Sequence, residues 1–258
     1  MQGKPDKVKK YQEKLNTINS SNDGFVLNGK TWIKQQQNMP HYATMVESMD
    51  ENVGRVIETL KRLKLEENTI VVFTSDNGGM ATNNRTDNIP TSNLPLKAGK
   101  GYLYEGGIRV SLVIKFGEKY NGQTCEIPVS GIDYYPTLLD LANIENSKAK
   151  DLEGLSLKSA LENKILKDRP VFWHYQHYSG GLGGTPSGAV RLGDFKLIEF
   201  YEDMSVELYN IKKDISESQN LAKINPEKVE ELKTLLHEWR KNVNAKMPYP
   251  NPYYSTPN

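Results

Sequence analysis

The strongest constraint on the fold is a short apolar run that ends in a polar, glycine-rich cluster. The sequence TIVVFTSDNGG occupies residues 69–79, and its β-branched and aromatic residues are typical of a buried strand. Asn-Gly is also the strongest short signal for a hairpin turn, but the next residues, Met-Ala-Thr-Asn-Asn, do not have the pattern of a returning strand. The run therefore predicts a strand, covered on both faces, that opens into a loop.

A long amphipathic helix is predicted before this strand, because apolar residues recur there at three- and four-residue spacing. They are Tyr42, Met45, Val46, Met49, Val53, Ile57, Leu60 and Leu63. A second strand is predicted at 110–116, followed by a helix at 130–144. In this helix, the residues expected to face inward are Ile132, Tyr135, Leu138, Leu139 and Ala142. This order of elements predicts an α/β domain, which we place at residues 1–167.

The composition changes near Asp168. Three segments, 171–178, 189–201 and 204–211, are predicted to be three strands, with turn residues at 193–194 and 202–203. A final helix is predicted over 226–242, with one apolar side made of Val229, Leu232, Leu235, Leu236 and Trp239. We expect 168–258 to form a second, smaller subdomain of antiparallel sheet packed on this helix.

Composition excludes several classes of protein. The 258 residues are 25% charged with a formal net charge of +1, so nothing indicates a nucleic acid or an anionic membrane as partner. No apolar run approaches the roughly 18 residues of a spanning helix, and the first fifteen residues lack the apolar segment of a secretory signal. Cys125 is the single cysteine, which excludes an internal disulfide, and we interpret it as an inert thiol.

Asp76 and Asn77 are candidates for a metal site. Ligands of α/β domains bind beyond the carboxyl ends of the strands, and these two residues follow a predicted strand. A carboxylate and a carboxamide offer the oxygen donors that Ca²⁺ and Mg²⁺ prefer, and Gly78 and Gly79 allow close backbone approach. Two oxygen ligands are too few for a complete site, so these residues alone leave the metal hypothesis open.

Several motifs together resemble a known family. In order they are YATMVESMDENVGRVIETL, TIVVFTSDNGG, LPLKAGKGYLYEGGIRV, IDYYPTLLDLANI and LEGLSL. This succession resembles the sulfatase family, the arylsulfatase-like members of the alkaline-phosphatase superfamily, over essentially the whole chain. The segment from Phe172 to Ile198 resembles the C-terminal subdomain of bacterial sulfatases that act on sulfated glycans. The resemblance implies a partial alkaline-phosphatase-like mixed sheet flanked by helices, and a sulfuric ester hydrolase that uses Ca²⁺.

The resemblance also implies roles for individual residues. Asp76 and Asn77 match the pair that supplies oxygens to the divalent cation, usually Ca²⁺, although Mg²⁺ would suit the same donors. Lys100 matches the lysine that binds the sulfate oxygens; taken alone it would be a solvated loop lysine. Glu105 matches the glutamate of the Glu-Gly-Gly element and is interpreted as structural, orienting the loop. Arg109 either helps likewise or makes an ordinary surface salt bridge.

The nucleophile of the family has no match here. Sulfatases use a formylglycine made from the first residue of a Cys/Ser-x-Pro-x-Arg motif. Cys125 has its proline one place too late, and Ser255-Thr256-Pro257 is followed only by Asn258. The first residues resemble the segment just after the family's His-Thr-Pro element, and His41 is not expected to replace that histidine. We therefore expect the C-terminal half of a bacterial sulfatase, inactive by itself.

His174 and His177 lie on a predicted strand among aromatic residues. Their spacing puts them on opposite faces, so they do not form a two-histidine metal site. Either one of them is buried and hydrogen-bonded, or one faces the substrate pocket beside Arg191 and binds sugar hydroxyls.

Three further expectations concern function. The substrate is expected to be a sulfated carbohydrate or an aryl sulfate, hydrolysed in the periplasm or outside the cell by analogy with the family. A phosphoester or phosphonate hydrolase of the same superfamily is the alternative enzyme. The non-enzymatic alternative is a truncated or split fragment that binds a partner half or a sulfated glycan. In either case a missing half is expected to leave apolar surface and strand edges uncovered.

Overall fold

The structure is a computed structural model that describes residues 2–18, 24–120, 122–145, 152–164, 166, 168–249 and 251–253. Residue 167, the last of the first predicted domain, and the segment 255–257 lie outside them. The chain forms two compact units. The first contains residues 1–24, 36–77 and 109–171, and the second contains 25–35, 78–108 and 172–258. The segments 25–35 and 78–108 therefore group with the C-terminal residues, a division that the linear order of the sequence does not indicate.

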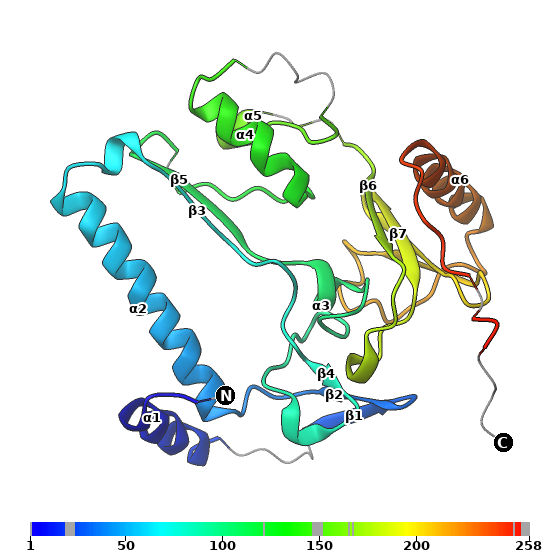
Figure 1. Ribbon diagram of the computed structural model, residues 1–258, viewed down its shortest axis with the longest axis horizontal. Helices are drawn as coiled ribbons and strands as arrows, with labels where there is room; N and C mark the ends of the chain where they lie inside the picture. Colours follow the sequence, from blue (N-terminus) through cyan, green and yellow to red (C-terminus); the bar gives the residue numbers. More distant parts are fainter. Residues whose placement is uncertain are drawn as a thin grey trace. The chain divides into compact units, whose positions relative to one another are not determined.

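The first unit is built around a long helix and a two-stranded ribbon. Its elements are α1 (Pro5–Asn16), α2 (Pro40–Arg62), η1 (Glu66–Asn68), β3 (Ile70–Thr74), β5 (Leu112–Phe116), η3 (Gly131–Asp133), α4 (Tyr134–Leu141) and α5 (Lys158–Leu161). Strands β3 and β5 are antiparallel, with Ile70 opposite Phe116 and Thr74 opposite Leu112. Helix α1 packs against the N-terminal half of α2, where Lys10 pairs with Glu47 at 2.7 Å (Figure 1).

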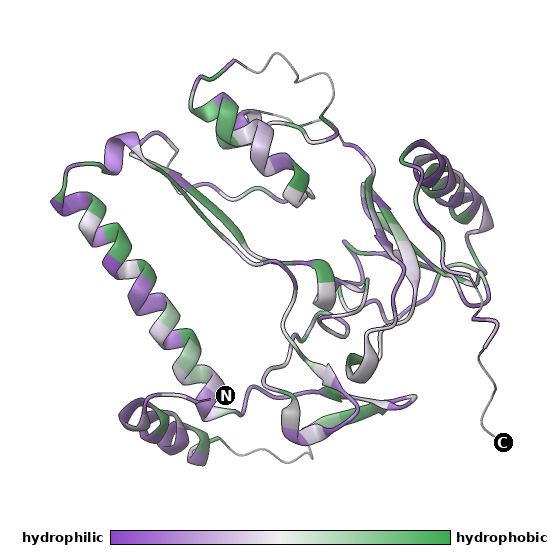
Figure 2. Ribbon diagram, in the orientation of Figure 1, coloured by the Kyte–Doolittle hydropathy of each residue, from purple (hydrophilic) through white to green (hydrophobic). Residues whose placement is uncertain are grey.

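The predicted helix over residues 42–63 is confirmed as α2, but its apolar side is not buried. Only Thr44 of this helix is buried, and three of the predicted inward residues are exposed by 42–48%: Met45, Val46 and Met49. Figure 2 shows apolar residues along the whole of α2 and along β3 and β5. The period of a sequence identifies an apolar face, but whether another element covers that face depends on the rest of the protein.

Two further burial predictions are wrong for the same reason. Strand β3 is confirmed, but it is half-buried rather than covered on both faces, and Phe73 is 37% exposed. In the predicted helix 130–144, the expected inward residues Ile132 and Tyr135 are at least half exposed, whereas Thr137 and Leu141 are buried. Many apolar residues of α2, α4 and the β3–β5 ribbon are thus exposed or only half-buried.

A buried carboxylate fixes the start of α4. Asp133 is fully buried, and its two oxygens accept hydrogen bonds from the N–H of Ser130 at 2.8 Å and of Leu155 at 2.9 Å. Arg169 forms an ion pair with the same carboxylate. This side chain joins three segments of the first unit that are distant in sequence.

The second unit contains two sheets. One has the strand order β1-β2-β4 and the other the order β6-β7-β8-β9, both antiparallel where the register is defined. The strands are β1 (Phe25–Asn28), β2 (Thr31–Lys34), β4 (Thr82–Asn83), β6 (Val171–Tyr175), β7 (Ser187–Leu192), β8 (Phe195–Phe200) and β9 (Val206–Asn210). The helical elements are η2 (Thr86–Asn88), α3 (Glu105–Ile108), η5 (Gly180–Leu182) and α6 (Pro226–Asn242).

The prediction for the C-terminal strands is corrected in two respects. The segment 171–178 is a strand only as far as Tyr175, so His174 lies on β6 but His177 lies beyond its end. The segment 189–201 is not one strand but the greater part of two, β7 and β8, which turn at Gly193 and Asp194. The sheet therefore has four strands instead of three. The predicted terminal helix is confirmed with the same bounds as α6, and the hairpin β1–β2 was not predicted.

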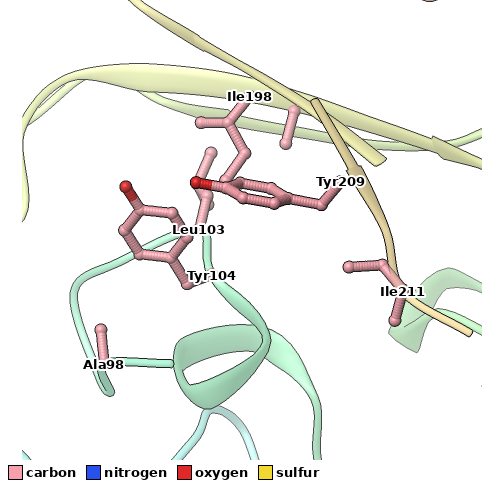
Figure 3. Close-up of a cluster of buried hydrophobic side chains, with 7 residues drawn as sticks. Ala98, Leu103, Tyr104, Ile198, Tyr209 and Ile211 are labelled. Carbon is pink, nitrogen blue, oxygen red and sulfur yellow. The ribbon is translucent and has the colours of Figure 1, made fainter. Parts of the chain in front are cut away.

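The core of the second unit lies on both faces of the four-stranded sheet. On one face, Leu232 and Leu236 of α6 form a buried cluster with three residues of the strands, Val190, Leu197 and Leu208. On the other face, three residues of the segment 97–108 form a second buried cluster with four residues of the sheet and its end (Figure 3). The cluster consists of Ala98, Leu103 and Tyr104 with Ala189, Ile198, Tyr209 and Ile211. Neighbouring residues of β7 and β8 alternate between the two clusters, as the period of a strand requires. Among the helices within the described ranges, none is long and apolar enough to cross a membrane.

Candidate functional site

Two glycine-rich motifs meet through their backbones in the second unit. The N–H of Gly78 donates to the carbonyl oxygen of Gly107 at 2.9 Å, and the N–H of Lys100 donates to that of Gly79 at 3.1 Å. The side-chain amide of Asn93 lies between them and donates to the carbonyl oxygens of Gly79, Ala98 and Gly106 at 2.8–3.1 Å. We call this arrangement the glycine junction.

Steric contacts explain the glycines at this junction. A Cβ atom on Gly78 would lie 1.9 Å from the carbonyl oxygen of Gly106, and one on Gly107 would lie 2.1 Å from that of Tyr102. Both distances are far below van der Waals contact with backbone atoms that cannot rotate away. The Asp-Asn-Gly-Gly cluster is therefore not a hairpin turn, and its glycines serve close packing of two loops.

Lys100 is held at the junction by its backbone while its side chain remains exposed. Within the ranges that the structure describes, its ammonium group has no hydrogen bond or ion pair. The loop around it is closed by the N–H of Tyr102, which donates to the carbonyl oxygen of Gly99 at 3.1 Å, and by the N–H of Gly106, which donates to that of Lys97 at 2.9 Å. Hydrogen bonds thus fix the backbone around Lys100, whereas its side chain is exposed.

Asp76 and Asn77 follow the end of β3 in the first unit. Asp76 is exposed and Asn77 is half-buried, and among the described residues neither side chain has a hydrogen-bond partner. The hydroxyl of Ser75 donates to the carbonyl oxygen of Asn77 at 2.9 Å, which shapes the turn. Since Lys100 belongs to the second unit, the grouping of these three side chains in one site stays a prediction.

The two side chains suit a hard cation in chemistry but not in number. The Asp76 carboxylate and the Asn77 amide oxygen are both available as oxygen donors, which Ca²⁺ and Mg²⁺ prefer. Across the described part of the chain, no cluster of three or more His, Cys, Asp or Glu side chains could hold a metal ion. Among the described residues, Asp76 and Asn77 thus offer two oxygen donors, fewer than the roughly six to eight that Ca²⁺ takes.

A buried ionic cluster lies beneath the loop that carries Lys100. Glu105 is 2% exposed, and its carboxylate pairs with Lys196 at 3.0 Å and with Arg191 at 3.5 Å. Lys196 is fully buried and also pairs with Glu217 at 2.8 Å. Burial raises the pKa of Glu217, and the nearby Lys196 ammonium opposes this change.

Sequence reasoning missed Lys196 and Glu217. A signal for Lys196 existed, because it alternates with Ile198 and Phe200 on one face of β8 and therefore occupies a core position. Nothing in the sequence around Glu217 indicates that it is buried.

A second polar group borders the same loop. The hydroxyls of Tyr104 and Tyr209 both donate to Glu207, at 2.7 and 2.8 Å, and the rings are in edge contact. Burial raises the pKa of both tyrosines, and the Glu207 carboxylate raises it further. The ammonium of Lys97 donates to the Tyr209 hydroxyl at 3.1 Å and lies 4.0 Å from the centre of the Tyr104 ring.

The three predicted sugar-binding residues have different surroundings. The Nδ1 of His174 accepts from the Tyr201 hydroxyl at 2.7 Å and its Nε2 donates to the carbonyl oxygen of Lys246 at 2.9 Å, so both ring nitrogens are engaged. His177 is exposed and touches the ring of Tyr175 edge-on. Arg191 pairs with the buried Glu105, and its role in binding a substrate stays a prediction.

Family models match most of the chain. The model described as Sulfatase matches residues 2–144, and the model described as N-sulphoglucosamine sulphohydrolase, C-terminal, matches residues 98–246. The chain belongs to the sulfatase family. The resemblance recognised in the motifs is thereby confirmed.

Curated relatives of this sulfatase-family chain agree. A sulfatase from Formosa agariphila is 37% identical over 205 residues, which are 72% of this chain and 36% of that protein. An N-acetylglucosamine-6-O-sulfatase from Bacteroides thetaiotaomicron is 33% identical over 232 residues, 86% of this chain and 39% of the relative. The chain therefore spans well under half the length of these relatives.

Solved structures confirm the fold. The crystal structure of Ps i-CgsB in complex with k-i-k-neocarrahexaose matches 92% of this chain and 46% of that one, with a TM-score of 0.71 and 27% identity. A second structure, of a protein in complex with its substrate D-glucosamine-2-N,6-O-disulfate, matches 83% of this chain and 42% of its own, with a TM-score of 0.62 and 30% identity. The α/β fold of the sulfatase-family chain is that of these proteins.

Proposed function

We propose that this chain carries the C-terminal part of a sulfuric ester hydrolase that acts on sulfated carbohydrate. The matched families support the reaction. The relative named N-acetylglucosamine-6-O-sulfatase, and the two solved structures in complex with k-i-k-neocarrahexaose and with D-glucosamine-2-N,6-O-disulfate, support the substrate class. The observation that carries the proposal is the glycine junction, where the backbone of Lys100 is bonded to that of Gly79, three residues after Asp76.

Lys100 is proposed to bind the sulfate group. A sulfate ester gains negative charge on its leaving oxygen as the bond to sulfur breaks, and a fixed ammonium group stabilises that charge. The exposed side chain of Lys100 on a hydrogen-bonded backbone supports this role, because little reorganisation is then needed when the anion arrives.

Asp76 and Asn77 are proposed to contribute two oxygen ligands to a divalent cation, Ca²⁺ or alternatively Mg²⁺. The unpaired oxygens of both side chains support this assignment. When bound, such a cation would supply further positive charge against the sulfate oxygens. The remaining ligands are proposed to come from an N-terminal sulfatase half.

The remaining parts of the catalytic site are proposed to come from an N-terminal sulfatase half, either an extension of this polypeptide or a separate chain. The 258 residues contain no Cys/Ser-x-Pro-x-Arg motif for a formylglycine, so this chain is proposed to be inactive by itself. The exposed apolar residues of α2, with Val113 of β5 at 56% exposure, support a partner surface in the first unit.

The non-enzymatic alternative is a truncated or split fragment that only binds this N-terminal half or a sulfated glycan. The periplasm or the cell exterior is proposed as the location by analogy alone.

A phosphoester or phosphonate hydrolase is the alternative enzyme, because a phosphoryl group is also a tetrahedral anion that a lysine and a divalent cation would bind. Direct binding of the two anions distinguishes the proposals. Calorimetric titration of the purified chain with sodium sulfate, in excess CaCl₂, is expected to show binding that Lys100→Ala weakens at least about tenfold, as loss of a charged hydrogen-bond donor requires. The matched control is Lys223→Ala, an exposed lysine of the same unit, which should bind like the wild type.

Two results would contradict the proposed role of Lys100 or the choice of sulfate as its ligand. Equal binding by the wild type and the Lys100→Ala variant would remove Lys100 from the site. Phosphate binding markedly tighter than sulfate binding, and equally dependent on Lys100, would favour the phosphoester alternative.

A further inference from the structure

The carboxylate of Glu105 lies at the centre of the ionic cluster beneath the Lys100 loop. Its Oε1 accepts from Lys196 at 3.0 Å and its Oε2 accepts from Arg191 at 3.5 Å. The backbone N–H of Glu105 itself donates to the Oε2 of Glu217 at 2.7 Å. Glu105 is therefore bound through its side chain to β7 and β8, and through its backbone to Glu217, which follows β9.

The charges of this cluster balance. Two carboxylates, Glu105 and Glu217, face two cations, Lys196 and Arg191, and Lys196 contacts both carboxylates. A buried ion pair contributes little net stability, because desolvation offsets most of the attraction. A shift of the loop would separate the Glu105 carboxylate from Lys196 and Arg191, so these ion pairs favour one arrangement of the loop.

Backbone hydrogen bonds carry the position of Glu105 to Lys100. The N–H of the next residue, Gly106, donates to the carbonyl oxygen of Lys97 at 2.9 Å, which closes the loop 97–106. The carbonyl oxygen of Gly106 accepts the same Asn93 amide that holds Gly79, the hydrogen-bond partner of Lys100. A displacement of Glu105 must therefore move the backbone at Lys100.

We propose that Glu105 is a positioning residue for Lys100: the Lys196–Glu105–Glu217 cluster fixes the loop 97–108 so that the ammonium of Lys100 is presented for the anion. The proposal rests on the proposed function of Lys100 as a sulfate ligand. It adds Lys196 and Glu217 to the residues on which binding depends, although neither touches the substrate.

Apolar packing is the competing explanation for the order of this loop. Leu103 and Tyr104 lie in the buried cluster with Ile198 and Tyr209, as Figure 3 shows, and such packing alone could hold the segment. The two explanations are distinguished by variants that remove the charge of a cluster residue but keep the shape of its side chain. Glu105→Gln does this, and Lys196→Met removes the facing cation from the sheet side.

Hydrogen exchange of the purified chain, read by mass spectrometry, tests the positioning role. We expect the amides of residues 99–108 to exchange at least about tenfold faster in Glu105→Gln, which removes the ion pairs of Glu105 with Lys196 and Arg191, and in Lys196→Met, which removes the cation that faces the buried Glu217 carboxylate. The amides of α6 should exchange at the wild-type rate, which also shows that each variant is folded. Glu230→Gln, an exposed glutamate on α6, is the matched control and should change nothing. Unchanged exchange at 99–108, or equal acceleration throughout the second unit, would overturn the proposal.

Added inorganic sulfate separates this proposal from the proposed function. In the wild type, sulfate should slow exchange at residues 99–102, and this protection should be lost in Glu105→Gln and in Lys100→Ala. Protection that persists in Glu105→Gln would overturn the positioning role while leaving Lys100 as the ligand. Absence of protection in the wild type would contradict the sulfate site and with it the positioning role. Faster exchange at 99–108 in the variants would then show only that the cluster orders the loop.

Discussion

The amide of Lys100 donates to the carbonyl oxygen of Gly79 over 3.1 Å, and the same oxygen accepts the side-chain amide of Asn93 at 2.8 Å. Two motifs about twenty residues apart are thereby joined by their backbones, with the side chain of Lys100 left exposed. The contact is made by backbone atoms, and glycines allow its close approach. Substitutions at the junction should therefore affect the Lys100 loop without altering any proposed ligand.

Gly78→Ala should destabilise the second unit, because the new methyl group would lie 1.9 Å from the carbonyl oxygen of Gly106. We expect a cost of about 1–3 kcal/mol or more in the free energy of unfolding, as for other overpacked sites. Urea unfolding followed by tryptophan fluorescence measures this, since Trp32, Trp173 and Trp239 all lie in the second unit. The control is Gly54→Ala in α2, where the methyl group meets nothing within 4 Å. A Gly78→Ala protein as stable as the control would contradict the close packing.

Asp133→Ala should destabilise the first unit, because it leaves Arg169 and the N–H groups of Ser130 and Leu155 without their acceptor. Loss of one partner of a buried charge pair costs about 3–5 kcal/mol. Hydrogen exchange at residues 130–141 should accelerate accordingly. Asp50→Ala, at an exposed position of α2, should change stability by less than about 0.5 kcal/mol. Similar exchange in the two variants would show that Asp133 does not anchor the helix.

Asp214 should make stability sensitive to acid. Burial acts to raise the pKa of this carboxyl, but hydrogen bonds from the N–H groups of Gln219 and Ser218 outweigh burial and hold the pKa below its ordinary value of 3.8. A depressed pKa in the folded state contributes stability above the unfolded pKa, and that contribution is lost as pH falls through the folded pKa. In Asp214→Asn the free energy of unfolding should therefore be lower at neutral pH and should fall less steeply below about pH 4. Parallel pH profiles for the two proteins would contradict this.

The chain should self-associate through the apolar residues of α2. Val46 and Met49 are 43% and 48% exposed on a helix whose only buried residue is Thr44. Exposed apolar patches of this kind promote association. Replacing both residues with lysine should shift the protein toward a monomer in light scattering after size exclusion, with an unchanged tryptophan unfolding transition. A wild-type chain that is already a monomer at high concentration would be the contrary result.

The purified chain should hydrolyse an aryl sulfate no faster than buffer, with or without added CaCl₂, because its sequence contains no motif for the formylglycine nucleophile. Release of the phenol, followed by absorbance, measures the rate. Turnover that a chelator abolishes would show that this chain holds a complete catalytic site.

The sequence by itself determined the local structure and the family. The bounds of α6 and the length of α2 follow from the 3.6-residue period of their apolar residues, and the strand β3 follows from a short continuous run of β-branched and aromatic residues. The Asp-Asn-Gly-Gly cluster and the Gly-Lys-Gly loop, taken in order with the other motifs, resembled the sulfatase family, which the family models confirm. None of these inferences needed a contact between distant residues.

Only the tertiary structure decided burial and partnership. The apolar side of α2 is exposed because no described element of its own unit covers it. The period of the apolar residues does not indicate whether another element will cover them. The partners of Glu105 come from segments about ninety and one hundred and ten residues later in the chain. Likewise, His174 is satisfied by Tyr201 and Lys246. Such pairs form where the fold brings distant segments together. The local sequence around one residue therefore does not indicate which residue of another element is its partner.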